Sequence, residues 1–422
     1  MELHVFRERG DTFQLVGSIN FSRGDMSFAY DAGYLDVRDS AAISLALPLR
    51  EEPFDQQEAS PFFAGLSPEG AMRRLVAESI HSDSFSDMLV RLNHESIGGL
   101  VFSTDREIEP EGCYEPIGID ALTELRNKPR AAAFEMGMAS RLSLSGAQSK
   151  AGLYHIGEDP TEGWYLPKGV AGTTHIVKTP EPIFPNQTVN EALCLEAARR
   201  CGFDVAEWML IPLPDGEPLI AVKRFDRWVD SGGSNSRGIV RPKRLHQEDF
   251  CQATGLMPDF KYEPTGAGYI ARVSSAILKA SSNPFGDRML FLQSVFFDYL
   301  MGNCDNHLKN YSLLWDVDWK SRQLAPRYDI VCTTLYPSIY LEMGISLCPS
   351  RRITDVTVRD IDTASRAAGV PVSMGRMLYQ EVCEGVPAAL DAAEEALCER
   401  GFSAASHVAE HIRSELKAKV RL

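Results

Sequence analysis

Alternating apolar and polar positions near the N-terminus predict a module rich in β-strands. In three runs between residues 3 and 30, apolar side chains recur at every second position, the period of a strand with one buried face. An amphipathic helix is predicted over 71–80, with Ser67 as its cap and Pro68 at its first position. We therefore expect a first, β-rich domain over residues 1–105.

The stretch 106–227 alternates strand patterns with one strong helix. Apolar residues at helical spacing predict that helix over 190–202, with Asn190 as its cap and Gly202 as its stop. Strands are predicted on both sides of it, and the last of them runs from Pro218 into charged residues. We expect this stretch to form a second domain of mixed strands and helix.

From residue 228 onward the hydrophobic pattern becomes mostly helical. A polar segment over 228–240, rich in Gly and Ser, first predicts a mobile loop. The helices predicted after it cover 247–254, 270–280, 288–302 and much of 354–422. An α/β first half followed by a mostly helical second half predicts an α+β fold with two lobes, in which 228–422 is the third domain.

One polar stretch interrupts these helices, and its side chains have the chemistry of phosphoryl transfer. Asp305 and Asn310 have the D-x-x-x-x-N spacing of kinases, in which the carboxylate faces the acceptor hydroxyl and the amide binds Mg²⁺. A hairpin over 311–328 would return Asp329 to Asn310 as a second metal ligand. The alternative is a polar loop in which Asp305 pairs with Lys309, because this spacing is common by chance.

Two upstream features could complete an ATP site. Small residues and hydroxyls over 143–150 would let backbone N–H groups face an anion, although the stretch matches neither a Walker loop nor G-x-G-x-x-G. Lys178 lies on a strand behind two β-branched residues, as does the kinase lysine that contacts ATP phosphates. The alternatives are a plain hairpin turn and a solvated edge charge. The strand that reaches Lys223 would offer backbone groups to adenine.

Charge and cysteine content narrow the class of protein. A net charge of -15 over 422 residues argues against nucleic-acid binding by the chain alone, so contact with DNA would need a partner. Nine cysteines without a C-x-x-C pair fit reduced thiols. We see no signal peptide, and no apolar run approaches the ~20 residues that span a bilayer. These features predict a cytoplasmic protein with no membrane contact.

Taken in order, the motifs resemble the HipA family of serine/threonine kinase toxins, the toxin halves of bacterial toxin–antitoxin pairs. The resemblance runs from about residue 1 to 340 and implies a two-lobed protein-kinase-like fold that uses ATP and Mg²⁺. The motifs are Phe62-Phe-x-Gly-Leu-x-Pro-Glu-Gly70, Leu144-Ser-Gly-Ala-Gln-x-Lys150, Thr174-His-Ile-Val-Lys178, Asn190-Glu191, Ala221-Val-x-Arg-Phe-Asp-Arg227, Leu245-x-Gln-Glu-Asp-Phe-Cys-Gln252, Asp305-x-His-x-Lys-Asn310 and Tyr328-Asp-Ile330.

The resemblance also implies a role for each candidate residue. Asp305 matches the catalytic base, Asn310 and Asp329 match the magnesium ligands, and Lys178 matches the lysine that reaches the ATP phosphates. Two further residues of the catalytic-loop motif, in support or in phosphate contact, are His307 and Lys309. The phosphate-binding loop and the adenine-contacting hinge are matched by Ser143, Ser145, Gly146, Ala147, Gln148, Ser149 and Lys150, and by Lys223, Arg224 and Phe225.

Family members phosphorylate a serine in their own phosphate loop, which ejects the loop and stops the kinase. Ser143 matches that serine best, but Ser145 stands where some relatives have Ala, so both are candidates for autophosphorylation. Ser149 departs from the acidic residue that often precedes Lys150 in this family.

The resemblance implies a helix-turn-helix antitoxin as partner, with DNA contacted only through that protein. The best-known members suggest an aminoacyl-tRNA synthetase as substrate, the glutamyl enzyme foremost. Two other hypotheses stay open: a catalytically silent member that binds an antitoxin in operator repression, and a kinase of small molecules or lipids. The presence of every catalytic residue favours the protein kinase.

Overall fold

The computed structural model describes residues 1–10, 12–22, 25–92, 95–108, 112–142, 148–229, 239–336 and 341–420. The chain forms two compact units and passes repeatedly between them. Unit 1 comprises Met1–Glu181, Glu207–Glu248 and Leu314–Lys320, and unit 2 comprises Pro182–Ala206, Asp249–Leu313 and Ser321–Leu422. The mixture of sheets and helices confirms the predicted α+β class. The three expected domains stay a prediction, and two of them fall largely within unit 1.

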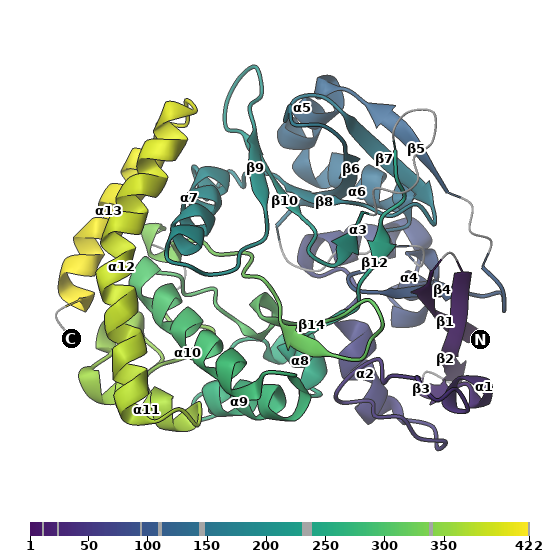
Figure 1. The fold of residues 1–422 in the computed structure, drawn as a ribbon. Coiled ribbons are helices and arrows are strands. Elements are labelled where there is room, and N and C mark those ends of the chain that lie inside the picture. Colours follow the sequence, from purple (N-terminus) through teal and green to yellow (C-terminus); the bar gives the residue numbers. More distant parts are fainter. Residues whose placement is uncertain are drawn as a thin grey trace. The chain divides into compact units, whose positions relative to one another are not determined.

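The N-terminal part of unit 1 is an antiparallel sheet in the order β3-β2-β1-β4 (Figure 1). Its core is aromatic: the Phe28 ring of β3 stacks on Phe54 with centroids 6.1 Å apart and packs at a tilt on Phe63 with centroids 5.3 Å apart. Each alternating run predicted near the N-terminus lies in one of these strands. The elements are β1 (Glu2–Arg9), β2 (Thr12–Ser22), β3 (Asp25–Tyr30), α1 (Ala32–Leu35), α2 (Gln56–Ala64), α3 (Gly70–Ile80), α4 (Phe85–Arg91) and β4 (Leu100–Ser103).

Helix α3 confirms the predicted helix, but its predicted cap was wrong. Glu69 precedes the helix, and no side chain caps it. Ser67 lies two residues further upstream, where its side chain is buried and too early in the chain to reach the first turn.

A six-stranded sheet in the order β5-β7-β6-β8-β10-β9 forms the rest of unit 1. One face packs on two helices through Leu122, Ala133, Val177 and other apolar side chains. Successive side chains of a strand point to opposite faces, so Lys178, next to Val177, points away from this core. The elements are β5 (Gly112–Ile117), α5 (Ile119–Asn127), α6 (Pro129–Ser140), β6 (Lys150–His155), β7 (Trp164–Gly169), β8 (His175–Lys178), β9 (Trp208–Ile211), β10 (Leu219–Lys223), β11 (Arg227–Trp228) and β12 (Lys243–Arg244).

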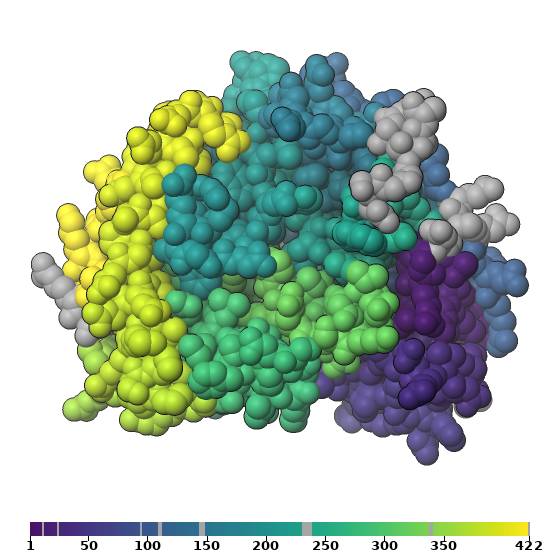
Figure 2. All heavy atoms as spheres, in the orientation of Figure 1, coloured from purple at the N-terminus to yellow at the C-terminus, as the bar shows by residue number. Residues whose placement is uncertain are grey.

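Unit 2 is mostly helical, as the sequence predicts. Its central helix α10 packs on α9, α12 and α13, and α13 lies at the surface, where its yellow atoms are visible in Figure 2. The helices are α7 (Gln187–Arg200), α8 (Phe250–Ala253), η1 (Pro258–Phe260), α9 (Tyr269–Ala280), α10 (Pro284–Met301), η2 (Leu308–Asn310), η3 (Thr333–Leu335), η4 (Ile353–Asp355), α11 (Val358–Ala367), α12 (Val372–Glu399) and α13 (Ala404–Lys419). Within the described ranges, none of these helices combines the length and apolar character that a bilayer crossing requires.

Three predicted helix starts in this region were wrong, and one of them is that of α10, which starts at Pro284 and not at residue 288. The helix α7 starts after Asn186, and Asn190 is fully buried inside it, where it binds the backbone of Cys332. The helix expected from residue 247 starts only at Phe250, because Asp249 caps it in a capping box and the residues before it form a strand.

That strand belongs to a three-stranded sheet in the order β13-β14-β15. Its strands are β13 (Gln247–Asp249), β14 (Ser312–Trp315) and β15 (Arg322–Leu324). The return strand was predicted over 324–328, but it spans 322–324 and shares only Leu324 with the prediction. Pro326 cannot donate to a ladder, so the strand ends before it. Most of the loop expected over 228–240 lies outside the described residues.

Candidate active site

The catalytic-loop motif follows directly on helix α10. Gly302 ends the helix in the left-handed conformation, with φ of 74°, as the helix-ending position favours. A side chain could not replace its hydrogen, because a Cβ atom would lie 2.4 Å from the hydroxyl of Thr334. The chain therefore turns sharply at this point and enters the segment 303–310.

Within this segment the backbone folds Asn310 back beside Asp305. The Asn310 side-chain amide donates to the Asp305 carbonyl at 2.8 Å, and the Asp305 backbone N–H donates to the side chain of Asn303 at 3.0 Å. Residues 301–310 are all buried except Asp305, whose side chain is 40% exposed. The loop is thus held by internal hydrogen bonds and exposes one carboxylate, that of Asp305, to solvent.

Asp298, in the last turns of α10, anchors this loop. Its buried carboxylate accepts hydrogen bonds from Asn303 at 3.0 Å and from Tyr311, on opposite ends of the loop. Arg327 donates to both carboxylate oxygens, at 2.8 and 3.0 Å. Asp298 was not among the predicted site residues. A signal for it exists, because a negative charge near a helix C-terminus opposes the helix dipole and so indicates a specific positive partner.

Asp329 adopts a left-handed backbone conformation, with φ of 57°, which is uncommon for a residue other than glycine and typical of constrained functional positions. Its neighbour Tyr328 donates a hydrogen bond to the Lys309 carbonyl at 2.7 Å. The two predicted metal ligands directly follow these bonded residues in sequence: Asn310 follows Lys309, and Asp329 follows Tyr328.

The donors at this position suit magnesium. The Asn310 nitrogen is committed to Asp305, so the oxygen of its amide is the atom that can face a cation. An amide oxygen and a carboxylate are the hard ligands that Mg²⁺ takes when phosphate oxygens and waters complete its shell. No cluster of three or more His, Cys, Asp or Glu side chains suited to a metal occurs in the described ranges.

The two other predicted residues of the motif are buried supports. The Lys309 ammonium pairs with Asp249 at 2.9 Å. The alternative interpretation had expected Lys309 to pair with Asp305. Burial lowers the pKa of His307, so its imidazole is neutral at neutral pH. The carboxylate of Asp305 instead accepts a hydrogen bond from the Tyr262 hydroxyl at 2.5 Å.

Unit 1 holds the predicted phosphate-contacting lysine. Lys178 is buried and is the direct cross-strand partner of Lys150, so both lysines extend from the same face of the sheet. Gln148 donates to the Thr179 carbonyl at 2.6 Å, which ties the end of the phosphate-loop segment to the strand of Lys178. The predicted loop residues outside the described residues are Ser143, Leu144, Ser145, Gly146 and Ala147.

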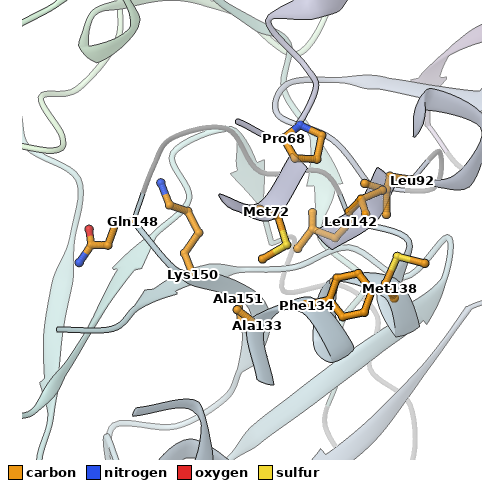
Figure 3. Close-up of a pocket in the computed structure, with 12 residues that line it drawn as sticks. Pro68, Met72, Leu92, Ala133, Phe134, Met138, Leu142, Gln148, Lys150 and Ala151 are labelled. Atoms are coloured by element: carbon orange, nitrogen blue, oxygen red, sulfur yellow. The ribbon is translucent and has the colours of Figure 1, made fainter. Parts of the chain in front are cut away.

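A small, partly open hollow borders Gln148 and Lys150 (Figure 3). Its walls are mostly apolar, with Met72, Phe134 and Leu142 among them, and Gln148 and Lys150 supply the polar part of its lining. The apolar walls of this hollow are unsuited to a triphosphate, which needs positive charge and hydrogen-bond donors.

The predicted hinge residues lie at the end of β10 and have different environments. Lys223 is exposed and pairs with Glu207 at 2.8 Å, and Phe225 is half-buried. The side chain of Arg224 is buried, so a nucleotide contact by this residue would use its main chain.

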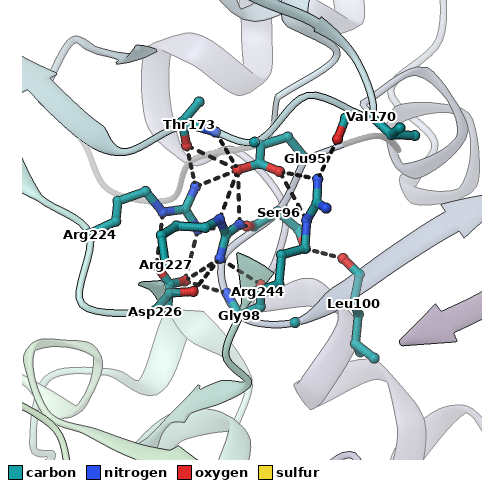
Figure 4. Close-up of polar contacts among 12 residues, drawn as sticks. Glu95, Ser96, Gly98, Leu100, Val170, Thr173, Arg224, Asp226, Arg227 and Arg244 are labelled. Atoms are coloured by element: carbon teal, nitrogen blue, oxygen red, sulfur yellow. Dashed lines mark hydrogen bonds and ion pairs between the residues drawn. The ribbon is translucent and has the colours of Figure 1, made fainter. Parts of the chain in front are cut away.

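Arg224 belongs to a buried charge cluster around Glu95 (Figure 4). The Glu95 carboxylate accepts hydrogen bonds from Arg224 at 3.1 Å, from Arg227 at 2.9 Å and from Arg244 at 2.7 Å. Burial alone would raise the pKa of Glu95, but the three guanidinium charges outweigh it and lower the pKa to about 2. Asp226 completes the cluster by accepting two hydrogen bonds from Arg224 and one from the Gly98 backbone.

The cluster fixes the hinge against the N-terminal part of unit 1. Arg224 and Arg227 flank Phe225, and both also donate to the Ser96 carbonyl, at 2.8 and 2.7 Å. No local pattern in the sequence points to Glu95, because its partners lie 129, 132 and 149 residues away along the chain. Only the unusual density of arginines around Phe225 hinted at a buried acidic partner.

Two protein-family models match this chain, one near its N-terminus and one over most of the remainder. Residues 12–103 match a model described as the HipA N-terminal domain, and residues 142–390 match one described as the HipA-like C-terminal domain. These ranges contain every predicted site residue.

Individual relatives agree with these matches. The chain is 33% identical to "Putative kinase Y4mE" of Sinorhizobium fredii, over 86% of both chains. It is 26% identical to the serine/threonine-protein kinase toxin HipA of Shewanella oneidensis, over 82% of this chain and 78% of that protein. Its fold is similar to that of HipA in a Shewanella oneidensis complex of HipA, HipB and operator DNA, with a TM-score of 0.81 and 21% identity over 99% of this chain and 97% of that one.

Proposed function

Because the chain belongs to the HipA family of kinases, we propose that it transfers the γ-phosphoryl group of ATP to a serine or threonine hydroxyl of a protein, as the toxin of a bacterial toxin–antitoxin pair. The observation that carries this proposal is the exposed carboxylate of Asp305 on a buried loop, with Asn310 bonded back to the Asp305 carbonyl at 2.8 Å. This is the relation of base and metal ligand that phosphoryl transfer needs.

Each predicted residue then has a role in one reaction. Asp305 orients the acceptor hydroxyl and takes its proton, while the hydroxyl oxygen bonds to the γ-phosphorus and ADP leaves. Asn310 and Asp329 would hold magnesium, which supplies positive charge to the triphosphate. Lys178 contacts the phosphates, with the loop that ends at Lys150, and the backbone of the hinge, Lys223 to Phe225, receives adenine.

We further propose that the kinase phosphorylates its own loop, at Ser143 or Ser145. The chain offers two hydroxyls in this loop, and family resemblance makes either a target. As an external substrate we propose an aminoacyl-tRNA synthetase, the glutamyl enzyme first. These assignments rest on the family alone.

The proposed partner is a helix-turn-helix antitoxin. The structurally similar Shewanella oneidensis HipA was solved with HipB and operator DNA. A net charge of -15 fits DNA contact through a partner better than direct contact, because phosphate binding needs concentrated Lys and Arg.

Mass spectrometry of the purified protein tests the kinase proposal. Wild type and Asp305→Ala, both treated with phosphatase, are incubated with ATP and Mg²⁺, and phosphate is located by peptide mapping. We expect phosphate on Ser143 or Ser145 in wild type and at least a hundredfold less in the variant, since general-base catalysis contributes about 10²–10⁴-fold. If wild type gains no phosphate while it still binds an antitoxin, the silent-partner hypothesis replaces the kinase.

A further inference from the structure

The catalytic carboxylate has a specific hydrogen-bond donor. Among the described residues, the Tyr262 hydroxyl is the one side-chain group that donates to Asp305, at 2.5 Å from Oδ1. The His307 Nε2 atom lies 3.9 Å from the same oxygen, beyond hydrogen-bond distance. Within the described residues, the other oxygen, Oδ2, therefore remains for the acceptor hydroxyl.

The backbone on both sides of Tyr262 is bonded to the catalytic region. The Lys261 carbonyl accepts the N–H of Leu308 at 3.1 Å, inside the catalytic-loop motif. The Glu263 N–H donates to the Gly344 carbonyl at 2.8 Å. Gly344 in turn packs so closely on the motif that a Cβ atom on it would lie 2.7 Å from the backbone nitrogen of His307.

The side chain of Glu263 adds further anchors to the same segment. One carboxylate oxygen accepts the backbone N–H groups of Gly268 and Tyr269, at 2.8 and 3.1 Å. The other accepts the N–H of Ser346 at 2.8 Å. The residues on both sides of Tyr262 are thus fixed by the fold of unit 2, and its side chain, which is 36% exposed, lies at the surface beside Asp305.

The Tyr262 ring also packs on the motif. It meets the His307 ring edge-on, with centroids 5.0 Å apart and an interplanar angle of 83°. A phenylalanine at position 262 would keep this packing and lose only the hydroxyl. The hydrogen bond can therefore be removed without removing the contact.

We propose that Tyr262 is a positioning residue for phosphoryl transfer: its hydroxyl holds Oδ1 of Asp305 and so directs Oδ2 toward the acceptor hydroxyl. This inference rests on the proposed kinase function. An exposed carboxylate without such a bond would rotate among several orientations, and proton transfer needs one of them. Tyr262 itself takes no proton from the acceptor, and the hydroxyl proton passes to Asp305 as ADP leaves.

The test compares self-phosphorylation of phosphatase-treated wild type and Tyr262→Phe in single turnovers. The rate at saturating ATP is divided by the number of molecules that bind a non-hydrolysable ATP analogue, so unfolded protein does not count. We expect this rate to fall about tenfold, with the half-saturating ATP concentration within about twofold of wild type. The ratio of phosphate on protein to free phosphate should also fall, because water can adapt its position and a serine cannot.

Tyr379→Phe is the control for the loss of a tyrosine hydroxyl elsewhere in unit 2, since the Tyr379 hydroxyl donates to the Lys419 carbonyl at 3.0 Å. It should leave the rate, the ATP dependence and the ratio unchanged. A Tyr262→Phe rate within twofold of wild type overturns the inference. The inference is also overturned if Tyr262→Phe changes both the half-saturating ATP concentration and the melting temperature while the ratio of protein-bound to free phosphate stays the same. That result would indicate a structural role for Tyr262. If Asp305→Ala is as active as wild type, the kinase proposal itself fails, whatever Tyr262 does.

Discussion

At the scale of single residues, the carboxylate of Asp298 joins three segments of the catalytic region. It accepts hydrogen bonds from Asn303, Tyr311 and Arg327, and neither Asp298 nor Arg327 has appreciable contact with solvent. We predict that Asp298→Ala lowers the free energy of unfolding by about 3–5 kcal/mol, because it leaves the Arg327 charge buried without its partner. Urea unfolding of wild type and variant measures this difference.

An exposed ion pair of the same unit provides the control for Asp298. Asp391 pairs with Arg413 at 2.8 Å, and its side chain is 66% exposed. Asp391→Ala should cost no more than about 1 kcal/mol, because solvent screens such pairs. Equal losses for the two variants would show that Asp298 is not the anchor that its contacts indicate.

Residues that act locally were predictable, and residues that act at a distance were not. Asp305 and Asn310 follow from their spacing, because a five-residue interval sets their geometry within one loop. Asp298 and Glu95 have partners that are set by the fold: Arg327 is 29 residues from Asp298, and Arg227 is 132 residues from Glu95. No local pattern encodes such pairs.

At the scale of elements, helix α13 supports the segment that follows Asp329. Its Glu415 accepts the Thr334 hydroxyl at 3.0 Å, and its His411 lies 3.3 Å from the same oxygen. Hydrogen bonding to Cys332 and to Glu415 raises the pKa of His411 to about 10. Burial would raise the pKa of Glu415, but His411 and Lys419 outweigh it and lower the pKa to about 2.

These shifts predict a pH dependence of stability with a definite sign. The His411 pKa is raised on folding, so its contribution is complete below the unfolded value of about 6.5 and is lost as the pH rises to about 10. We expect the free energy of unfolding of wild type to fall relative to His411→Gln across this window. Denaturant unfolding at a series of pH values measures both curves. Parallel curves from pH 6.5 to 10 would mean that His411 is not charged in the folded protein.

The elements themselves were largely predictable, and their ends were less so. Helices α9 and α10 follow from long apolar periodicity. The start of α10 was predicted four residues too late, although Asn283 as cap and Pro284 at the first position are the local signals for it. The wrong prediction before α8 has a physical cause. Gln247 and Glu248 are buried, which is compatible with a strand or a helix, and only pairing with β14 selects the strand. Pairing is a property of the fold, so the periodicity of one segment cannot contain it.

At the scale of the whole chain, the Glu95 cluster joins parts of unit 1 that are far apart in sequence. Glu8 of β1 accepts from Arg244 at 3.2 Å, and Glu95 accepts from Arg244 at 2.7 Å. Arg224 and Arg227 belong to the region of the six-stranded sheet, where Asp226 supplies one carboxylate, and the other two carboxylates of the cluster, Glu8 and Glu95, come from residues 1–105. This dependence argues that the N-terminal domain and the sheet that carries Lys178 fold as one cooperative body, even though separate family models describe them.

Two changes of increasing severity test this cooperativity. Glu95→Gln keeps the side-chain shape but removes the charge that three arginines share, and we expect it to cost about 3–5 kcal/mol. Deletion of residues 1–105 removes Glu8 and Glu95 together, so the remaining chain should show no cooperative melting of unit 1 and no ATP binding. Glu115→Gln, in an exposed pair with Lys168, should leave the free energy of unfolding nearly unchanged, because solvent screens this pair. A truncated chain that melts like the full protein and still binds ATP would mean that the N-terminal domain is a separable attachment, and the buried arginines would then need another source of negative charge.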